Sequence, residues 1–245
     1  MSPARLTIRR TLTELRSSYS TVTAAAGFLV ASAALFTYGL CRAEGVAEPL
    51  TAIWAMSVAP LLPLVSAVFG MDVWSEERRS GRIELMLSAP VDEAAFVIGK
   101  FLGVWIAVML LTAISAAVSF SALFYLSPVT LGNQPLHDFP PVFLLMAVQS
   151  LLWCAIAVAS SACFNKGTVA ALISIALGFA LPRGIWAALA EWSEAGRAAF
   201  GVFPPDAQVT DAASGLLQVA STIEYLILTA AVLFVNFPTF IIIHI

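Results

Sequence analysis

Six apolar stretches, each long enough to cross a lipid bilayer, are the feature that most restricts how this chain can fold. A helix of about 20 apolar residues spans the hydrocarbon core. The stretches are 21–40, 50–70, 99–126, 141–164, 168–186 and 222–243. Only 11% of the residues are charged, against roughly 25% in soluble domains. Because backbone polar groups in lipid must bond within their own helix, the sequence predicts an all-α integral membrane fold, one domain covering 1–245 with six transmembrane helices.

The N-terminal segment 4–19 predicts an amphipathic helix lying at the membrane surface. Its apolar residues recur at helical spacing, and three arginines share another face. The apolar set is Ile8, Leu12, Leu15 and Tyr19, and the basic set is Arg5, Arg9 and Arg16. A secretory signal peptide is the alternative, but the apolar run 21–40 is longer than the core of such a peptide. We therefore expect an interfacial helix that contacts membrane lipid.

The basic residues predict the orientation in the membrane. Nine of the 12 Lys and Arg residues fall in the N-terminal segment, the loop after the second apolar stretch and position 166. Because basic residues favour the cytoplasmic side, both termini and that loop are expected there. A weakly hydrophobic region at 187–221 then lies outside. It fits an amphipathic or re-entrant pair of helices, or an ordinary surface loop.

The loop after the second stretch holds an unusual concentration of charge. Segment 72–100 contains ten of the 27 Lys, Arg, Asp and Glu residues, and burying them in lipid would cost several kcal/mol each. We therefore expect 72–98 to be an exposed cytoplasmic loop. Apolar residues inside it follow a helical spacing, with charged residues around them and Pro90 ending the helix. The apolar residues are Ile83, Leu85, Met86 and Leu87, and the charged ones are Glu77, Arg78, Arg82 and Glu84. This pattern predicts a docking helix; the alternative is a solvated linker.

A few polar or small residues in the spans are further candidates. Gln149 and Asn236 could face a transport pathway or a partner. Gly99 and Gly103 form a G-x-x-x-G pair that would let another helix approach closely. Lys100 is expected to extend to the cytoplasmic surface. No nucleotide motif is present, because the residues around Gly99 and Lys100 lack the first Gly and the Ser or Thr of a P-loop, and neither histidines nor cysteines have metal-site spacing.

The loop residues resemble the signature E-x-x-x-G-(T)-(L/I)-E-L-L-L-(S/T)-x-P-V…-(L/I)-G-K of type-2 ABC transporter permeases. The matching residues are Glu77, Gly81, Ile83, Glu84, Leu85, Leu87, Ser88, Pro90, Val91, Ile98, Gly99 and Lys100. Segment 13–19 is similar to the K-R-E-L-R-S-Y-F entry helix of the family. The nearest resemblance is to gliding-motility and nitrous-oxide-reductase-maturation permeases. Arg82 and Asp92 depart from the signature, where Thr and Ser or Thr are frequent.

The resemblance implies a function and a set of sites. The chain would be the non-catalytic permease subunit of an exporter in the bacterial cytoplasmic membrane, paired with a second permease as a homodimer or heterodimer. It would bind no cofactor and no nucleic acid, because ATP and Mg²⁺ would sit in a separate ABC ATPase. A coupling helix between spans two and three would dock on that ATPase. Its residues would be Glu77, Arg78, Gly81, Arg82, Ile83, Glu84, Leu85, Leu87 and Pro90; those of the interfacial helix would be Arg5, Arg9, Leu12, Leu15 and Arg16.

Two other functions stay open at this point. One is an intramembrane enzyme acting on lipid headgroups, for which Asp72, Glu76 and Glu77 are the only clustered candidates. The other is a membrane scaffold subunit that moves no substrate. The class of substrate cannot be inferred, since no charged pocket or large outer domain is predictable from the sequence.

Overall fold

The computed structural model describes residues 3–42, 49–81, 93–126, 139–180, 212 and 219–242, and every regular element in these ranges is helical. The elements are α1 (Pro3–Ser17), α2 (Tyr19–Arg42), α3 (Leu50–Val58), a 3₁₀ turn (Ala59–Leu61), α4 (Leu62–Gly70), α5 (Asp72–Arg79), α7 (Glu93–Leu126), α9 (Phe139–Cys163), α10 (Gly167–Ala180) and α14 (Val219–Ile242). The predicted all-α fold is confirmed.

Four helical stretches in the described part are long and apolar enough to cross a membrane. They are Tyr19–Arg42, Leu50–Arg79, Ala94–Phe124 and Phe139–Cys163, and they cover the first four predicted spans except for residues 125, 126 and 164. The fifth and sixth predicted spans coincide with α10 and α14, whose described apolar parts are shorter. A total of six spans therefore stays a prediction.

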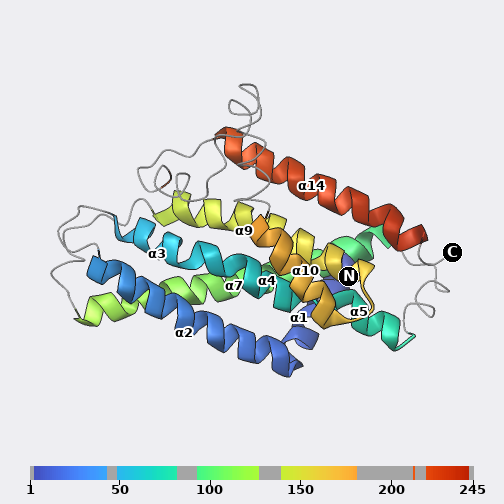
Figure 1. The fold of residues 1–245 in the computed structure, drawn as a ribbon, viewed down its shortest axis with the longest axis horizontal. Coiled ribbons are helices and arrows are strands. Elements are labelled where there is room, and N and C mark those ends of the chain that lie inside the picture. The colour runs from blue at the N-terminus through green and yellow to red at the C-terminus, as the bar shows by residue number, and fades with distance from the viewer. Residues whose placement is uncertain are drawn as a thin grey trace.

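Helix α9 lies at the centre of the bundle. It packs against α4, α7, α10 and α14, while α2 and α7 run beside α3 and α4 along the length of the molecule (Figure 1). Small residues let these helices approach closely. A Cβ atom at Gly70 of α4, for example, would lie 2.6 Å from the Cβ of Ala157 in α9. The second predicted span is thus held directly against the fourth.

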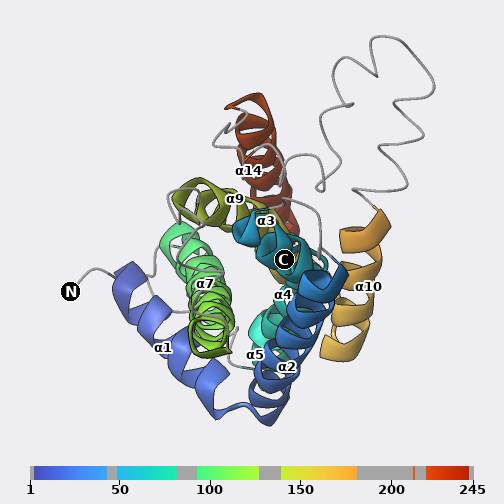
Figure 2. The same ribbon diagram turned by 90° about the vertical axis from the view of Figure 1, so that its left-hand side faces the viewer.

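Helix α1 does not continue the line of α2. Viewed along the bundle, α1 lies across its long axis and packs on α7, whereas α7 and α2 are seen nearly end-on (Figure 2). Only Ser18 separates the two helices. The Thr21 hydroxyl fixes the turn by donating to the carbonyls of Leu15 (2.5 Å) and Ser18 (2.9 Å). This crosswise position is the one expected of an interfacial helix, although it ends at Ser17, two residues earlier than predicted.

The second span is interrupted twice. The 3₁₀ turn at Ala59–Leu61 contains Pro60, and it confirms the kink expected from proline, which cannot donate a backbone hydrogen bond. The second interruption is the single turn residue Met71 between α4 and α5, which keeps helical backbone angles (φ −60°, ψ −36°). Helix α5 therefore extends the second span beyond the predicted boundary at residue 70.

The predicted docking helix, with Glu77 and Arg78 beside the apolar residues of 83–87, is interrupted at Gly81. Helix α5 ends at Arg79, where the Ser80 N–H donates to Glu76 O (3.0 Å) and the Gly81 N–H to Arg78 O (3.2 Å). Gly81 then has a φ of +68°, a left-handed conformation that ends helices and that glycine adopts without strain. Since helices reach Arg79 and restart at Glu93, the connection is shorter than the predicted loop 72–98. Residues Arg82, Ile83, Glu84, Leu85, Leu87 and Pro90 lie outside the described residues, as does almost all of 187–221.

Candidate functional site

Helix α5 begins under a cap supplied by another helix. The first N–H groups of a helix have no partner inside it. Here the Ser161 hydroxyl of α9 accepts from the N–H groups of Trp74 (3.0 Å) and Ser75 (3.3 Å). The same hydroxyl donates to the carbonyl of Met71 (2.8 Å). Ser161 thus satisfies both sides of the break at Met71 and fixes the start of α5 to the fourth span.

The C-terminal end of α5 is bound to the C-terminal end of α9. Arg78 Nη1 donates to Asn165 Oδ1 (2.9 Å), and Nη2 donates to the carbonyl of Ala162. Ala162 lies in the last turn of α9, where carbonyls lack helical partners and a cation is favourable. Arg78 is therefore half-buried against α9 in this chain. Its role at the ATPase surface stays a prediction, and within this chain the guanidinium already has two partners.

Glu77 forms a buried ion pair with α7. Its Oε2 lies 2.5 Å from Lys100 Nζ, and the two side chains are only 6% and 4% exposed. Lys100 also donates to the carbonyl of Val73 (2.6 Å) and lies over the rings of Trp74 and Phe96. The expectations of an exposed Glu77 and of a Lys100 reaching the membrane surface are both wrong. The physical reason is that each charge finds an opposite charge inside the bundle, which offsets the cost of leaving water.

Helix α1, which packs on α7, also contributes to this charged group. Arg10 Nε is 2.8 Å from Glu14 Oε1, and Arg10 Nη2 is 3.8 Å from Glu77 Oε1. The hydrogen bond that Arg10 donates to Glu14 raises the pKa of Arg10 above its already high ordinary value, so Arg10 stays charged at any physiological pH. The close approach predicted at Gly103 is confirmed, and the partner is α1: a Cβ there would lie 2.8 Å from the Cβ of Thr11.

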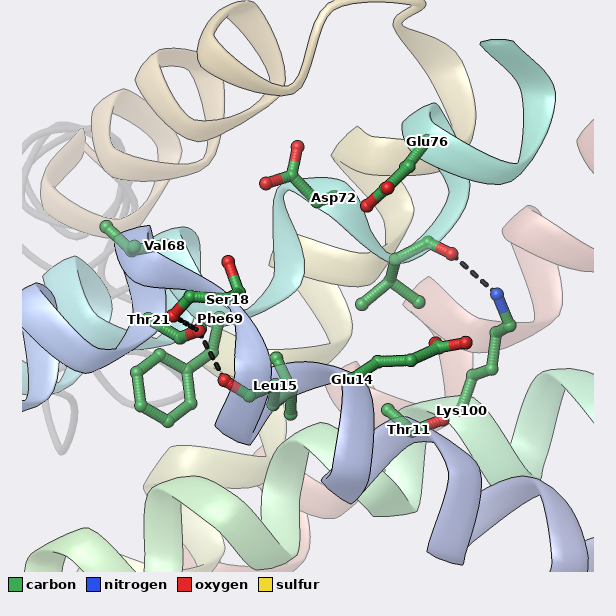
Figure 3. A pocket seen from close by; sticks show the side chains of 11 residues that line it. Thr11, Glu14, Leu15, Ser18, Thr21, Val68, Phe69, Asp72, Glu76 and Lys100 are labelled. Carbon is green, nitrogen blue, oxygen red and sulfur yellow. Dashed lines mark hydrogen bonds between the residues drawn. The ribbon is translucent and has the colours of Figure 1, made fainter. Parts of the chain in front are cut away.

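A small cavity of about 50 Å³ lies between α1, α4, α5 and α7. This volume holds a few water molecules. Glu14, Asp72 and Glu76 face it from two sides, and Lys100 forms part of its wall (Figure 3). Asp72 also reaches the fifth span, because a Cβ at Gly167, the first residue of α10, would collide with its Oδ1. The carboxylate thereby lies at the positive end of α10.

The remaining predicted residues are placed as follows. Arg5, Arg9 and Arg16 are exposed on α1, and Leu12 and Leu15 are half-buried. Gln149 is buried within α9, with 2% of its surface exposed. Asn236 lies in α14, and its side chain is outside the described part. The pathway role of the last two residues stays a prediction.

Sequence reasoning missed three contact residues: Arg10, Thr11 and Ser161. Ser161 and Thr11 are small polar residues in helices, and such residues usually bond to their own backbone. Only the tertiary arrangement shows that Ser161 caps another helix. Asn165 lies just after an apolar run, where a helix end needs partners, and its bond to Arg78 agrees with that position.

The contacts of α5 link it to four other helices: α1 through Arg10, α7 through Lys100, α9 through Ser161 and Ala162, and α10 through Gly167. A helix of eight residues held in this way cannot move without moving its neighbours. We call this set of contacts the α5 junction. We expect its role to be mechanical, because Glu77 and Lys100 pair with each other and Arg78 is bound to the end of α9.

Comparison with known proteins agrees with the membrane architecture. A family model described as "ABC-2 family transporter protein" matches residues 8–236. The match includes α5, the connection to α7 and most of α1. A comparison with curated proteins found no match.

Proposed function

We infer that this chain, which belongs to the ABC-2 family of transporter membrane proteins, works as the permease subunit of an exporter driven by a separate ATPase. ATP and Mg²⁺ would bind in that ATPase, and this chain would contribute no catalytic residue. The nearer resemblance to gliding-motility and nitrous-oxide-reductase-maturation permeases stays a prediction.

The α5 junction is the observation that carries this proposal. The segment 82–92, which resembles the coupling signature of the family, follows α5 after only Ser80 and Gly81. A push on that segment would reach α5 through a short connection. Because Glu77, Arg78 and Ser161 tie α5 to α7 and α9, the movement would be transmitted to the spans. An unattached loop would absorb it instead.

The proposed docking surface is now smaller than the sequence indicated. Glu77 and Arg78 would act inside the chain, as links to α7 and α9. The docking contact would be made by Arg82, Ile83, Glu84, Leu85 and Leu87, whose apolar residues would enter a groove of the ATPase while the charges set the register. Gly81 would act as the joint between the two parts, because its left-handed backbone lets the chain change direction.

The proposed assembly contains two permease chains and two ATPases in a bacterial cytoplasmic membrane, with both termini in the cytoplasm. The excess of Lys and Arg on that side supports the orientation. Many large apolar side chains are exposed on α2, α7 and α10, among them Val30, Leu110 and Leu172. They fit contact with lipid or with the second permease, which would be an identical or a related chain.

The lipid-headgroup enzyme is the weaker candidate. Of its three carboxylates, Glu77 is taken up by the ion pair with Lys100, which leaves Asp72 and Glu76 at the cavity. A scaffold role fits the exposed apolar surface equally well. It gives no reason, however, for a short helix linked to four others next to a coupling signature.

Co-purification through a tag on this chain tests the proposal. Wild type should retain a subunit that carries a Walker A motif, and the double variant Glu84→Arg/Leu85→Asp should lose it. The variant Arg42→Gln, at the opposite end of α2, is the control and should retain it. Retention of the ATPase by the double variant would move the docking surface elsewhere. If wild type brings down no ATPase in mild detergent, the exporter proposal fails.

A further inference from the structure

The four arginines of α1 fall into two sets. Arg10 pairs with Glu14 and approaches Glu77, on the flank that faces α5. Arg5, Arg9 and Arg16 are exposed, and within the described residues none of them has an ion pair. Glu14 is the only acidic residue of α1, and it is engaged by Arg10. The second set therefore carries three positive charges, and no acidic side chain among the described residues neutralises them.

These three arginines form one row along the helix. At about 100° per residue, they fall within about 40° of one another when viewed down the axis of α1. The row borders the half-buried Leu12 and lies away from the α7 contact made by Thr11 and Gly103. Long arginine side chains in such a place can rest their methylene groups on apolar surface and keep the guanidinium groups in water.

The position of α1 puts the row at the depth of the lipid headgroups. The helix lies across the bundle axis (Figure 2), and only Ser18 separates it from α2, a candidate membrane span. A helix joined in this way must lie where the span meets water. The exposed Tyr19, 84% accessible at the start of α2, is also typical of the membrane boundary.

We propose that Arg5, Arg9 and Arg16 bind the phosphate groups of anionic phospholipids. Charge complementarity selects this occupant: a guanidinium donates two parallel hydrogen bonds to a phosphate, and a lipid with net negative charge neutralises the row. A zwitterionic lipid offers phosphate together with a compensating cation. Bound lipid would fix α1 against α7, and through Arg10 it would steady the α5 junction. The proposal does not depend on transport.

Native mass spectrometry of the full-length protein in detergent, titrated with phosphatidylglycerol, tests the proposal. Each basic residue near an anionic surface changes lipid affinity by about fivefold, so Arg5→Gln/Arg9→Gln/Arg16→Gln should bind the lipid on the order of one hundredfold more weakly. The charge-preserving Arg5→Lys/Arg9→Lys/Arg16→Lys variant should lose much less. Arg42→Gln should bind as wild type does. Wild type should bind phosphatidylcholine more weakly than phosphatidylglycerol, and the affinity for phosphatidylcholine should differ little among the variants.

Three results would overturn the proposal. The first is equal phosphatidylglycerol binding by wild type and the glutamine variant. The second is an equal loss for phosphatidylcholine, which would indicate apolar contact in place of charge recognition. The third is unchanged lipid binding together with loss of a co-purifying protein from the glutamine variant, which would assign the row to an acidic protein surface. Circular dichroism of both triple variants provides the folding control, and each should keep the helical content of wild type.

Discussion

Glu77 Oε2 and Lys100 Nζ lie 2.5 Å apart inside the bundle, and this ion pair joins α5 to α7. The residues are 23 positions apart in the sequence, on either side of the connection 80–92. Each charge needs the other, because an isolated charge in such surroundings is costly.

Removing one partner of this pair should therefore be worse than removing both. Lys100→Met or Glu77→Leu alone leaves a buried charge and should destabilise the protein by about 3–5 kcal/mol. The double variant Glu77→Leu/Lys100→Met leaves no buried charge and should lie close to wild type. Thermal unfolding of the purified protein, followed by intrinsic fluorescence, measures the difference. A double variant as unstable as the sum of the singles would show that the two residues are not coupled.

Two serine-to-alanine variants distinguish the cap that Ser161 provides for α5 from the general effect of losing a serine in α9. Ser161→Ala removes the hydroxyl that accepts from the N–H groups of Trp74 and Ser75 and should cost about 1–3 kcal/mol. Ser160→Ala is the matched control, since the Ser160 hydroxyl bonds only to Ile156 O of its own helix (2.8 Å) among the described residues.

Hydrogen–deuterium exchange followed by mass spectrometry provides the specific readout. Amides of peptides covering 72–79 should exchange faster in Ser161→Ala and as in wild type in Ser160→Ala. Equal protection of α5 in both variants would contradict the capping role.

The sequence predicts the spans well and the junction poorly, for a physical reason. A membrane span is recognised from a local property, the length of an apolar run, so α2, α7 and α9 begin and end within a few residues of expectation, except for the earlier start of α7 at Glu93. Charge density alone predicts a surface position for Glu77, because charged side chains favour water. Whether a buried Lys100 lies opposite it depends on how α5 and α7 pack, which no local pattern contains.

The contact between Gly103 and Thr11 should determine whether α1 can lie against α7. Gly103→Ala places a methyl group 2.8 Å from the Cβ of Thr11, which one of the two helices must move to relieve. We expect a lower melting temperature and faster trypsin cleavage at the arginines of α1. Gly27→Ala is the control, because a Cβ there meets no atom within 4 Å, and it should be neutral or slightly stabilising.

A second substitution checks that the effect comes from this contact. Thr11→Gly/Gly103→Ala removes the colliding side chain and should recover part of the loss, less about 1 kcal/mol for a glycine within α1. Faster trypsin cleavage that persists unchanged in the double variant would mean that Gly103 acts through another neighbour.

Arg78 and Arg79 differ in their contacts, and this difference allows a test of the α5 junction in the assembled transporter. Arg78 donates to Asn165 and to the carbonyl of Ala162, whereas Arg79 is exposed. Lysine keeps the charge but cannot make both hydrogen bonds in the same plane. Arg78→Lys should therefore destabilise the protein by about 1.5–3 kcal/mol, and Arg79→Lys should have no measurable effect.

Arg78→Lys should also weaken the coupling between ATP and movement of the spans. In the co-purified complex, Arg78→Lys should retain the ATPase, because the proposed docking residues 82–87 are unchanged, yet ATP should produce a smaller movement of the spans. Spin labels on exposed positions of α2 and α10, such as Val30 and Leu172, report that movement as a change in distance with ATP and vanadate. If the change in spin-label distance is the same in Arg78→Lys and Arg79→Lys, α5 does not transmit the movement through α9. If Arg78→Lys loses the ATPase while it remains folded, Arg78 belongs to the docking surface after all.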